Sequence, residues 1–179
     1  MLRLLLPLFV LSVLFTSTSC KKDLFGEEPE NLPVGTIICK VDGEAFETKF
    51  GTSALSEPQG GVSFFNISGF ESLAPVMDDY IQISFGVPDG FQLGENTYAT
   101  EGINCTPVPE ICGILFYRFG ESTDEYGSTF AGGSCTIEFT TMEFESGGKV
   151  SGKFSGTLIR DFNGGEVTIT EGKFNNIIL

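Results

Sequence analysis

Apolar and polar residues alternate in short runs from residue 36 to the end of the chain. Between residues 80 and 87, Ile81, Ile83, Phe85 and Val87 lie on one face and other residue types on the opposite face. This period of two predicts strands with one buried face and one face in water. No run after residue 20 keeps the 3.6-residue period of a helix. The pattern therefore predicts an all-β, antiparallel domain of about ten short strands, found mainly at 36–41, 44–50, 62–70, 80–87, 96–100, 114–119, 135–144, 149–159 and 166–179.

Turn and bulge signals divide these runs. Asp42-Gly43 predicts a hairpin with a type I′ turn, because both central residues of that turn need a positive φ. Two runs change their apolar parity part-way, and an extra residue in a strand would restore it. We expect one bulge near Thr140-Thr141 and a second at Glu171-Gly172, where the glycine would supply the left-handed residue.

The run ILFYRF at 114–119 is apolar on both faces, which favours the packed layers of a β-sandwich. The 16 phenylalanines that follow residue 20 are expected to fill the core of that sandwich. The alternative is a lipocalin-like β-barrel whose interior carries a small apolar ligand.

The first 20 residues have a different pattern. Arg3 precedes an apolar run at 4–15, which as a helix would rise about 18 Å, too short for a hydrocarbon core of roughly 30 Å. Small residues then lead to Cys20. The segment resembles the signal and lipobox of bacterial lipoproteins, although Ser17 stands where leucine is usual. The resemblance implies cleavage before Cys20 and acylation of its thiol and amine, which would anchor the chain to a membrane without a spanning helix. A secretory signal that happens to contain a cysteine is the alternative.

These patterns divide the chain into a signal peptide at 1–19, a lipidated Cys20 with a flexible tether at 20–33, and one domain at 34–179. The stretches CKVDGEAFET at 39–48 and VSGKFSGTLIRDFNGGEVTITEGKF at 150–174 look like a group of uncharacterised β-rich lipoproteins of Bacteroidota-type bacteria. That likeness implies a cell-envelope location, with the outer membrane of a Gram-negative bacterium as the expected site. It implies no activity.

Charge and missing residue types exclude several functions. The formal net charge is −14, and becomes −15 without Arg3, so nucleic acid is not an expected partner. There is no histidine, which removes Ser-His-Asp triads, Cys-His pairs and histidine-ligated zinc. There is also no tryptophan, so a sugar-stacking platform would rely on other rings. The candidates for such a platform are Tyr80, Tyr98, Tyr117 and Tyr126.

The four cysteines after Cys20 suggest two disulfides in an exported chain. Cys105 and Cys112 flank a proline-rich loop that they would close. Cys39 and Cys135 lie in strand-like runs and both face the predicted core, where they would meet. A four-thiolate metal site is the alternative, but C-x-x-C spacing is missing.

Paired carboxylates are the remaining chemical groups: Glu44 with Glu47, Asp78 with Asp79, and Asp124 with Glu125. A glycosidase needs two carboxyls across a cleft, whereas these pairs lie in turns or near strand ends and read as solvated residues. We assign no catalytic residue, metal ligand or cofactor. The sequence favours a non-enzymatic, lipid-anchored envelope protein with a binding or structural role, whose partner would be a glycan or an envelope protein. The alternatives are a surface carbohydrate-binding accessory protein and a lipocalin-like carrier.

Overall fold

A computed structural model describes residues 24–48, 50–55, 61–70, 79–102, 104–106, 111–118, 124–160 and 164–179. These residues confirm the all-β prediction, with somewhat more strands than expected. They form two short 3₁₀ helices and twelve strands: η1 (Leu24–Gly26), η2 (Pro29–Asn31), β1 (Thr36–Val41), β2 (Glu44–Glu47), β3 (Phe50–Leu55), β4 (Val62–Phe70), β5 (Tyr80–Pro88), β6 (Thr97–Glu101), β7 (Asn104–Thr106), β8 (Cys112–Arg118), β9 (Glu125–Gly127), β10 (Ser134–Met142), β11 (Lys149–Arg160) and β12 (Glu166–Ile178).

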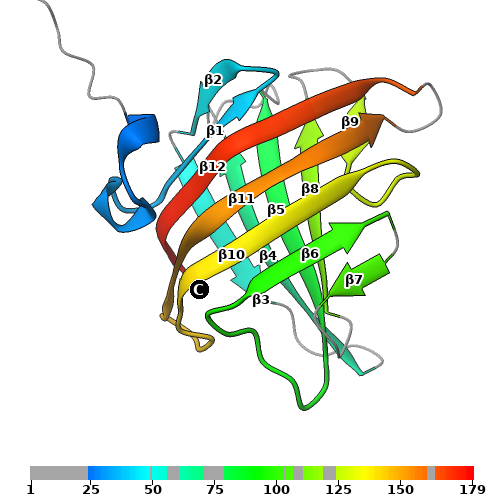
Figure 1. Cartoon of the computed structure of the whole chain (residues 1–179). Coiled ribbons are helices and arrows are strands. Elements are labelled where there is room, and N and C mark those ends of the chain that lie inside the picture. Colours follow the sequence, from blue (N-terminus) through cyan, green and yellow to red (C-terminus); the bar gives the residue numbers. More distant parts are fainter. Residues whose placement is uncertain are drawn as a thin grey trace, which may run out of the picture.

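The strands form one antiparallel sheet that curls into two layers. Its order is β2-β1-β12-β11-β9-β8-β5-β4-β3, with β10, β6 and β7 following from β11 as a side branch. Most of β11 pairs with β10, whereas Ile159 and Arg160 at its end pair with β9. In Figure 1, β1, β12, β11, β10 and β6 lie in front, and β3, β4, β5 and β8 lie behind them. The strand β9 therefore links a front layer to a back layer.

Aromatic rings fill the space between the layers. Phe139 on β10 lies 5.4 Å from the ring of Phe85 and 6.3 Å from that of Phe65, which both come from the back layer. It also lies 5.8 Å from Phe174 on β12. Burial of one such side chain contributes about 1.5–3 kcal/mol. These rings occupy the place where a lipocalin-like barrel would hold its ligand.

The predicted hairpin and bulges are present. Asp42 and Gly43 have φ values of 50° and 86° and join β1 to β2. The register of β10 with β11 shifts between Phe139 and Thr141, and that of β1 with β12 shifts opposite Glu171-Gly172. One detail is wrong: the left-handed residue of the second bulge is Glu171, with φ 52°.

Gly172 is required at that bulge for a different reason. A Cβ atom there would lie 2.4 Å from the carbonyl oxygen of Phe154 and 2.5 Å from the Phe154 ring. The glycine therefore allows β12 to approach β11 closely, as expected where two backbones are tightly packed.

The predicted Cys39–Cys135 disulfide is wrong, because both thiols are free and buried. Cys135 is aligned across the sheet with Val41 of β1 and not with Cys39. The alignment runs through the register pairs Cys135–Gly156, Gly156–Ile169 and Ile169–Val41. Three strand spacings of about 4.8 Å each separate β10 from β1 along the sheet. A disulfide needs Cα atoms within about 7 Å of each other. Both side chains thus face the core, as expected, but from separate places.

The other predicted bridge joins Cys105 to Cys112. Cys112 takes part in a disulfide bond, but the side chain of Cys105 lies outside the described residues. That pairing stays a prediction. Residues 1–23, including the signal peptide and Cys20, also lie outside the described part, and among the described residues no helix has the length and apolar character needed to cross a membrane.

The flexible tether expected at 20–33 is wrong from residue 24 onward. Residues 24–33, called here the N-terminal arm, contain η1 and η2 and contact β1, β11 and β12. Pro29 is buried and Leu32 is only 4% exposed. The arm is therefore a folded part of the domain (Figure 1).

Candidate functional site

The outer face of the back layer carries a row of aromatic side chains. The strand registers align Phe50 on β3 with Phe70 on β4, Phe70 with Tyr80 on β5, and Tyr80 with Arg118 on β8. Directly paired residues point to the same face of a sheet. We call these four residues the ring row. They face outward because the buried residues of β4 and β5, such as Ile67 and Ile81, have the opposite parity.

The ring row is held in a stacked arrangement. The rings of Phe70 and Tyr80 have centroids 5.9 Å apart and an interplanar angle of 23°. The Arg118 guanidinium lies 4.7 Å from the Tyr80 ring centroid and 3.7 Å from a carboxylate oxygen of Glu125. Such a cation–π contact contributes about 0.5–1 kcal/mol at exposed sites. Phe50, at the edge, is 37% exposed.

Polar side chains lie next to the ring row on β4 and β5. Nε2 of Gln82 donates to Oγ of Ser84 at 2.7 Å, and Oγ of Ser84 donates to Oδ1 of Asn66 at 2.7 Å. The same Gln82 nitrogen lies 3.3 Å from Oδ1 of Asn66. We call these three half-buried residues the amide cluster, and the ring row together with it the aromatic face. Each amide carries donors and acceptors, so the face combines flat rings with neutral hydrogen-bonding groups.

Tyr80 is a neutral member of this face at ordinary pH. Burial, followed by the Glu125 carboxylate, raises the pKa of its hydroxyl above the usual value, against the opposing effect of Arg118. The hydroxyl therefore keeps its proton and remains a hydrogen-bond donor.

The tyrosine platform predicted from the sequence is wrong for two of its members. Tyr98 and Tyr117 are only 3% and 2% exposed and belong to the core. The Tyr98 hydroxyl accepts from the backbone of Gly94 at 3.1 Å, and the Tyr117 hydroxyl donates to Asp79 at 2.7 Å. Tyr126 is half-buried and packs against the core. Only Tyr80 belongs to the ring row.

Sequence reasoning missed the exposed phenylalanines because it assigned all phenylalanines to the core. Phe64 and Phe91 are 50% and 46% exposed, and Phe50 is exposed too. A signal for this was present in VSFFNISGF, where Phe64 and Phe70 have the opposite parity to Phe65. Alternation places those two on the solvent face of β4.

Three members of the predicted carboxylate pairs, Asp79, Asp124 and Glu125, form hydrogen bonds or ion pairs, and Glu44 and Glu47 are exposed on β2. A pocket of about 460 Å³ lies beside the β1–β2 hairpin and brings Glu44 together with Asp42 and Asp79. However, Asp42 accepts from the backbone of Thr168 at 2.7 Å, and Asp79 accepts from Tyr117. Asp78 lies outside the described residues. Within the described part of the chain, no three His, Cys, Asp or Glu side chains are placed to hold a metal ion.

The remaining carboxylate pair forms ion pairs at the start of β9. Asp124 binds Arg160, and Glu125 lies beside Arg118. Neither arrangement places two carboxyls across a cleft, so no glycosidase geometry arises from these residues.

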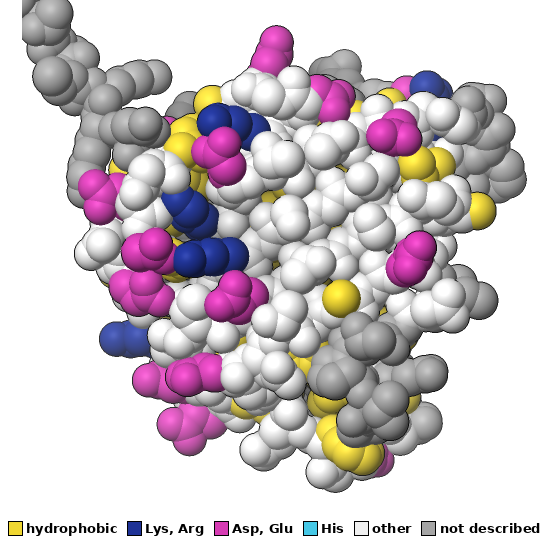
Figure 2. All heavy atoms as spheres, in the orientation of Figure 1, with side chains coloured by type: hydrophobic (Ala, Val, Ile, Leu, Met, Phe, Trp, Pro, Cys, Tyr) yellow, Lys and Arg dark blue, Asp and Glu magenta, His cyan; other side chains and the backbone are white. Residues whose placement is uncertain are grey.

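The outer face of the front layer is polar but largely uncharged at its centre (Figure 2). Thr168, Thr157 and Ser134 align in one row across β12, β11 and β10, and Ser155 and Thr136 align in the next. A shallow groove of about 280 Å³ follows these hydroxyls. In these rows the front layer offers hydroxyl groups, whereas the ring row of the back layer offers aromatic stacking.

Comparison with protein-family models, with curated proteins and with solved structures gives no match to this chain.

Proposed function

We propose that this chain is a non-enzymatic, lipid-anchored protein of the bacterial cell envelope that binds glycan chains on its aromatic face. The observation that carries the glycan part is the ring row with the amide cluster beside it. The anchor rests on the lipobox-like residues that end at Cys20, and the outer membrane of a Gram-negative bacterium is the proposed location.

Sugar chemistry fits the two parts of the aromatic face. A pyranose ring presents C–H groups on its flat faces and hydroxyls around its rim. Stacked aromatic side chains give an apolar surface for the C–H groups, while neutral amides and hydroxyls exchange hydrogen bonds with the rim. Consecutive outward positions on a strand are about 6.6 Å apart, so a sugar on the ring row lies within reach of the amide cluster.

The charge of the chain favours a neutral or cationic ligand over an acidic one. The formal net charge is −14, so acidic polymers would be repelled over most of the surface. Arg118 is the cation of the ring row, and it already lies beside Glu125. We therefore propose uncharged polysaccharides as the ligand class.

Affinity electrophoresis and pull-down with neutral soluble and insoluble polysaccharides test this proposal. Phe70→Ala and Tyr80→Ala should each weaken binding strongly. Stacking of a nucleic-acid base on one aromatic ring contributes about 1–3 kcal/mol, and we expect a similar contribution from a sugar ring. Phe91→Ala is the matched control, since Phe91 is also an exposed phenylalanine but lies outside the ring row.

Two results would overturn the proposal. One is a wild-type protein that retains none of the polysaccharides. The other is a loss of binding in Phe91→Ala equal to that in Phe70→Ala. Thermal melts of each variant show whether it remains folded. Turnover of a polysaccharide by the purified protein would refute the non-enzymatic part.

A protein partner in the envelope is the second candidate function. It is favoured by the exposure of Phe64 and Phe91, at 50% and 46% of their surfaces. Exposed apolar side chains mark protein contacts where they form a contiguous patch, and we propose that arrangement for these two rings. Cross-linking in intact cells should then capture a partner that Phe64→Ala loses while glycan binding persists.

A further inference from the structure

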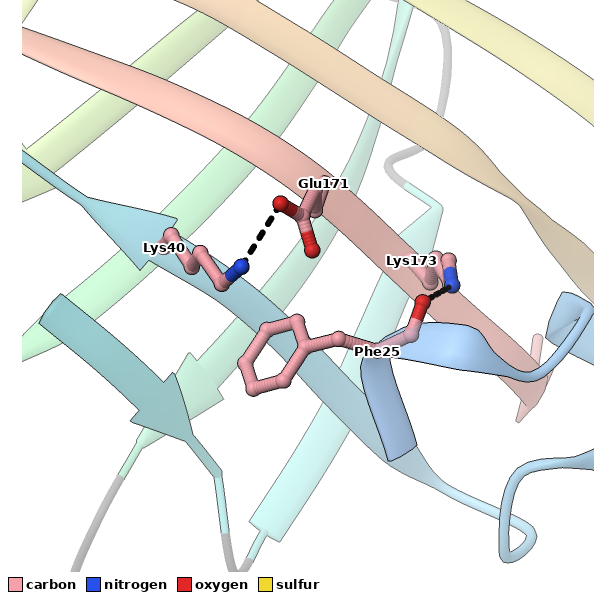
Figure 3. A network of polar contacts seen from close by, with 4 residues as sticks. All are labelled: Phe25, Lys40, Glu171 and Lys173. Carbon is pink, nitrogen blue, oxygen red and sulfur yellow. Dashed lines mark hydrogen bonds and ion pairs between the residues drawn. The ribbon is translucent and has the colours of Figure 1, made fainter. Parts of the chain in front are cut away.

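The N-terminal arm is fastened to the front layer by polar contacts from β11 and β12. The Lys173 ammonium donates to the carbonyl oxygen of Phe25 (Figure 3). It also donates to the carbonyl oxygen of Glu27 at 2.6 Å. Lys153 forms an ion pair with Glu28 at 2.5 Å. These contacts join segments 125 to 148 residues apart in sequence.

A buried asparagine fastens the end of the arm. Nδ2 of Asn175 donates to the carbonyl oxygen of Leu32 at 2.5 Å, and its Oδ1 accepts from Ser151 at 3.0 Å. Asn175 is only 1% exposed. Because a buried amide needs partners for both of its ends, this residue links the position of the arm to the packing of β11 and β12.

The arm also covers apolar surface. Ile38 points to the outer face of β1, since its neighbours Ile37 and Cys39 face the core, yet it is fully buried. The helix η1 contacts β1, and η2 contacts β11 and β12. The Phe25 ring lies under Lys40, whose ammonium is 5.1 Å from the ring centroid (Figure 3). The arm thus removes part of the front layer from water.

Three of the four lysines in the described part of the chain contact the arm. Lys40, Lys149, Lys153 and Lys173 all lie on β1, β11 or β12. In Figure 2 the dark blue groups of this face gather mainly on the side where the arm runs. Lys40 is paired with Glu171 and Lys153 with Glu28, so positive and negative groups lie side by side along the arm contact.

We propose that the N-terminal arm holds the domain against the membrane surface in one orientation, with the arm side of β1 and β12 toward the lipid headgroups. The inference rests on the acylation of Cys20 in the proposed function. Leu24 is four residues from Cys20, a span of about 14 Å at full extension. A docked arm therefore leaves too little chain for the domain to turn freely, whereas release of the arm would leave the 13 residues 21–33 between Cys20 and the domain.

The absence of tryptophan from the chain gives a clean probe of this orientation. We would introduce single tryptophans at Glu47→Trp, on β2 opposite Ile38 of β1, and at Asn104→Trp, on β7 at the other end of the front layer. The acylated protein would be inserted into vesicles whose lipids carry a nitroxide on the headgroup. We expect strong quenching at position 47 and little at position 104.

Variants of the arm separate orientation from simple attachment. The double change Lys153→Met with Lys173→Met should release the arm and make quenching at the two positions similar. Lys149→Met is the matched control and should leave the difference intact, because only the backbone of Lys149 is bonded, to Glu143. Equal quenching at both positions in the wild-type background would overturn the proposal, as would an unchanged difference in the double variant.

Flotation with vesicles distinguishes failure of the anchor from failure of the orientation. Protein that does not float refutes the anchor and with it this inference. Protein that floats but is quenched equally refutes the orientation alone. Polysaccharide binding by the aromatic face is measured without vesicles and is independent of both outcomes.

Discussion

The Lys40 ammonium lies 2.7 Å from Oε1 of Glu171, across 131 residues of sequence. Glu171 reaches it from the bulge of β12, where its φ of 52° is in the left-handed region. The same lysine lies over the Phe25 ring of the N-terminal arm. The bulge therefore contributes to the surface on which the arm rests, and the next residue, Gly172, sets how closely β12 approaches β11.

We predict that Glu171→Gly is tolerated and Gly172→Ala is not. A glycine at 171 relieves the left-handed strain and loses an exposed ion pair, two effects of about 0.5–1 kcal/mol that oppose each other. A methyl group at 172 would meet the backbone and ring of Phe154 and should cost about 1–3 kcal/mol. Urea unfolding measures both changes. Equal loss of stability in the two variants would contradict this assignment of roles.

The sequence was sufficient to predict much of this local structure. Alternation of apolar residues located the strands, and a change of parity located the bulges at Thr140-Thr141 and Glu171-Gly172. It did not predict that Glu171 adopts the left-handed conformation, because propensity favours glycine there. The close packing of Gly172 against Phe154 requires the glycine at position 172, and such a contact between two strands cannot be predicted from the sequence pattern.

The candidate site was predicted less well. Tyr98 and Tyr117 looked exposed because their hydroxyls are polar, yet Gly94 and Asp79 satisfy those hydroxyls at the edge of the core. The arm was taken for a tether because it is charged and contains proline. Ile38 was a sign to the contrary, since an apolar residue on the outward face of β1 requires a cover.

The two free cysteines should be unreactive in the folded protein. Cys39 and Cys135 are buried, and burial raises the pKa of both thiols, so little nucleophilic thiolate forms. We expect neither to react with a thiol reagent at pH 8 under native conditions and both to react in guanidinium chloride. The variants Cys39→Ala and Cys135→Ala show which cysteine supplies each reactive thiol. If neither cysteine reacts after unfolding without reductant, the two form a disulfide after all and the free-thiol assignment is wrong.

Docking of the arm should weaken at high pH. The hydrogen bond to Glu28 raises the pKa of Lys153 above its ordinary 10.5. Because the folded state holds this proton more tightly, the stabilisation is complete below pH 10.5 and is lost as the pH rises through the raised value. The protection of the arm amides from hydrogen exchange should therefore be higher in wild type than in Lys153→Met below that pH. The two proteins should become equal as the pH rises above it. Lys149→Met serves as control, and a difference that persists unchanged would contradict the role of Lys153.

Replacing Asn175 should loosen the arm and destabilise the domain together. In Asn175→Ala, the Leu32 carbonyl and the Ser151 hydroxyl lose a buried partner, at a cost of about 1–3 kcal/mol. Asn104→Ala, an exposed asparagine on β7, should change stability by less than about 0.5 kcal/mol.

Two measurements on Asn175→Ala decide whether the arm folds with the domain. Urea unfolding reports global stability, and cleavage by a glutamate-specific protease within residues 24–33 reports release of the arm. If the arm is part of the domain, the variant should lose stability and become cleavable at the arm below the unfolding transition. Loss of stability with the arm still protected would assign Asn175 to the packing of β11 and β12 alone. An arm that is cleaved as fast in wild type as in the variant would mean that it is not docked in solution.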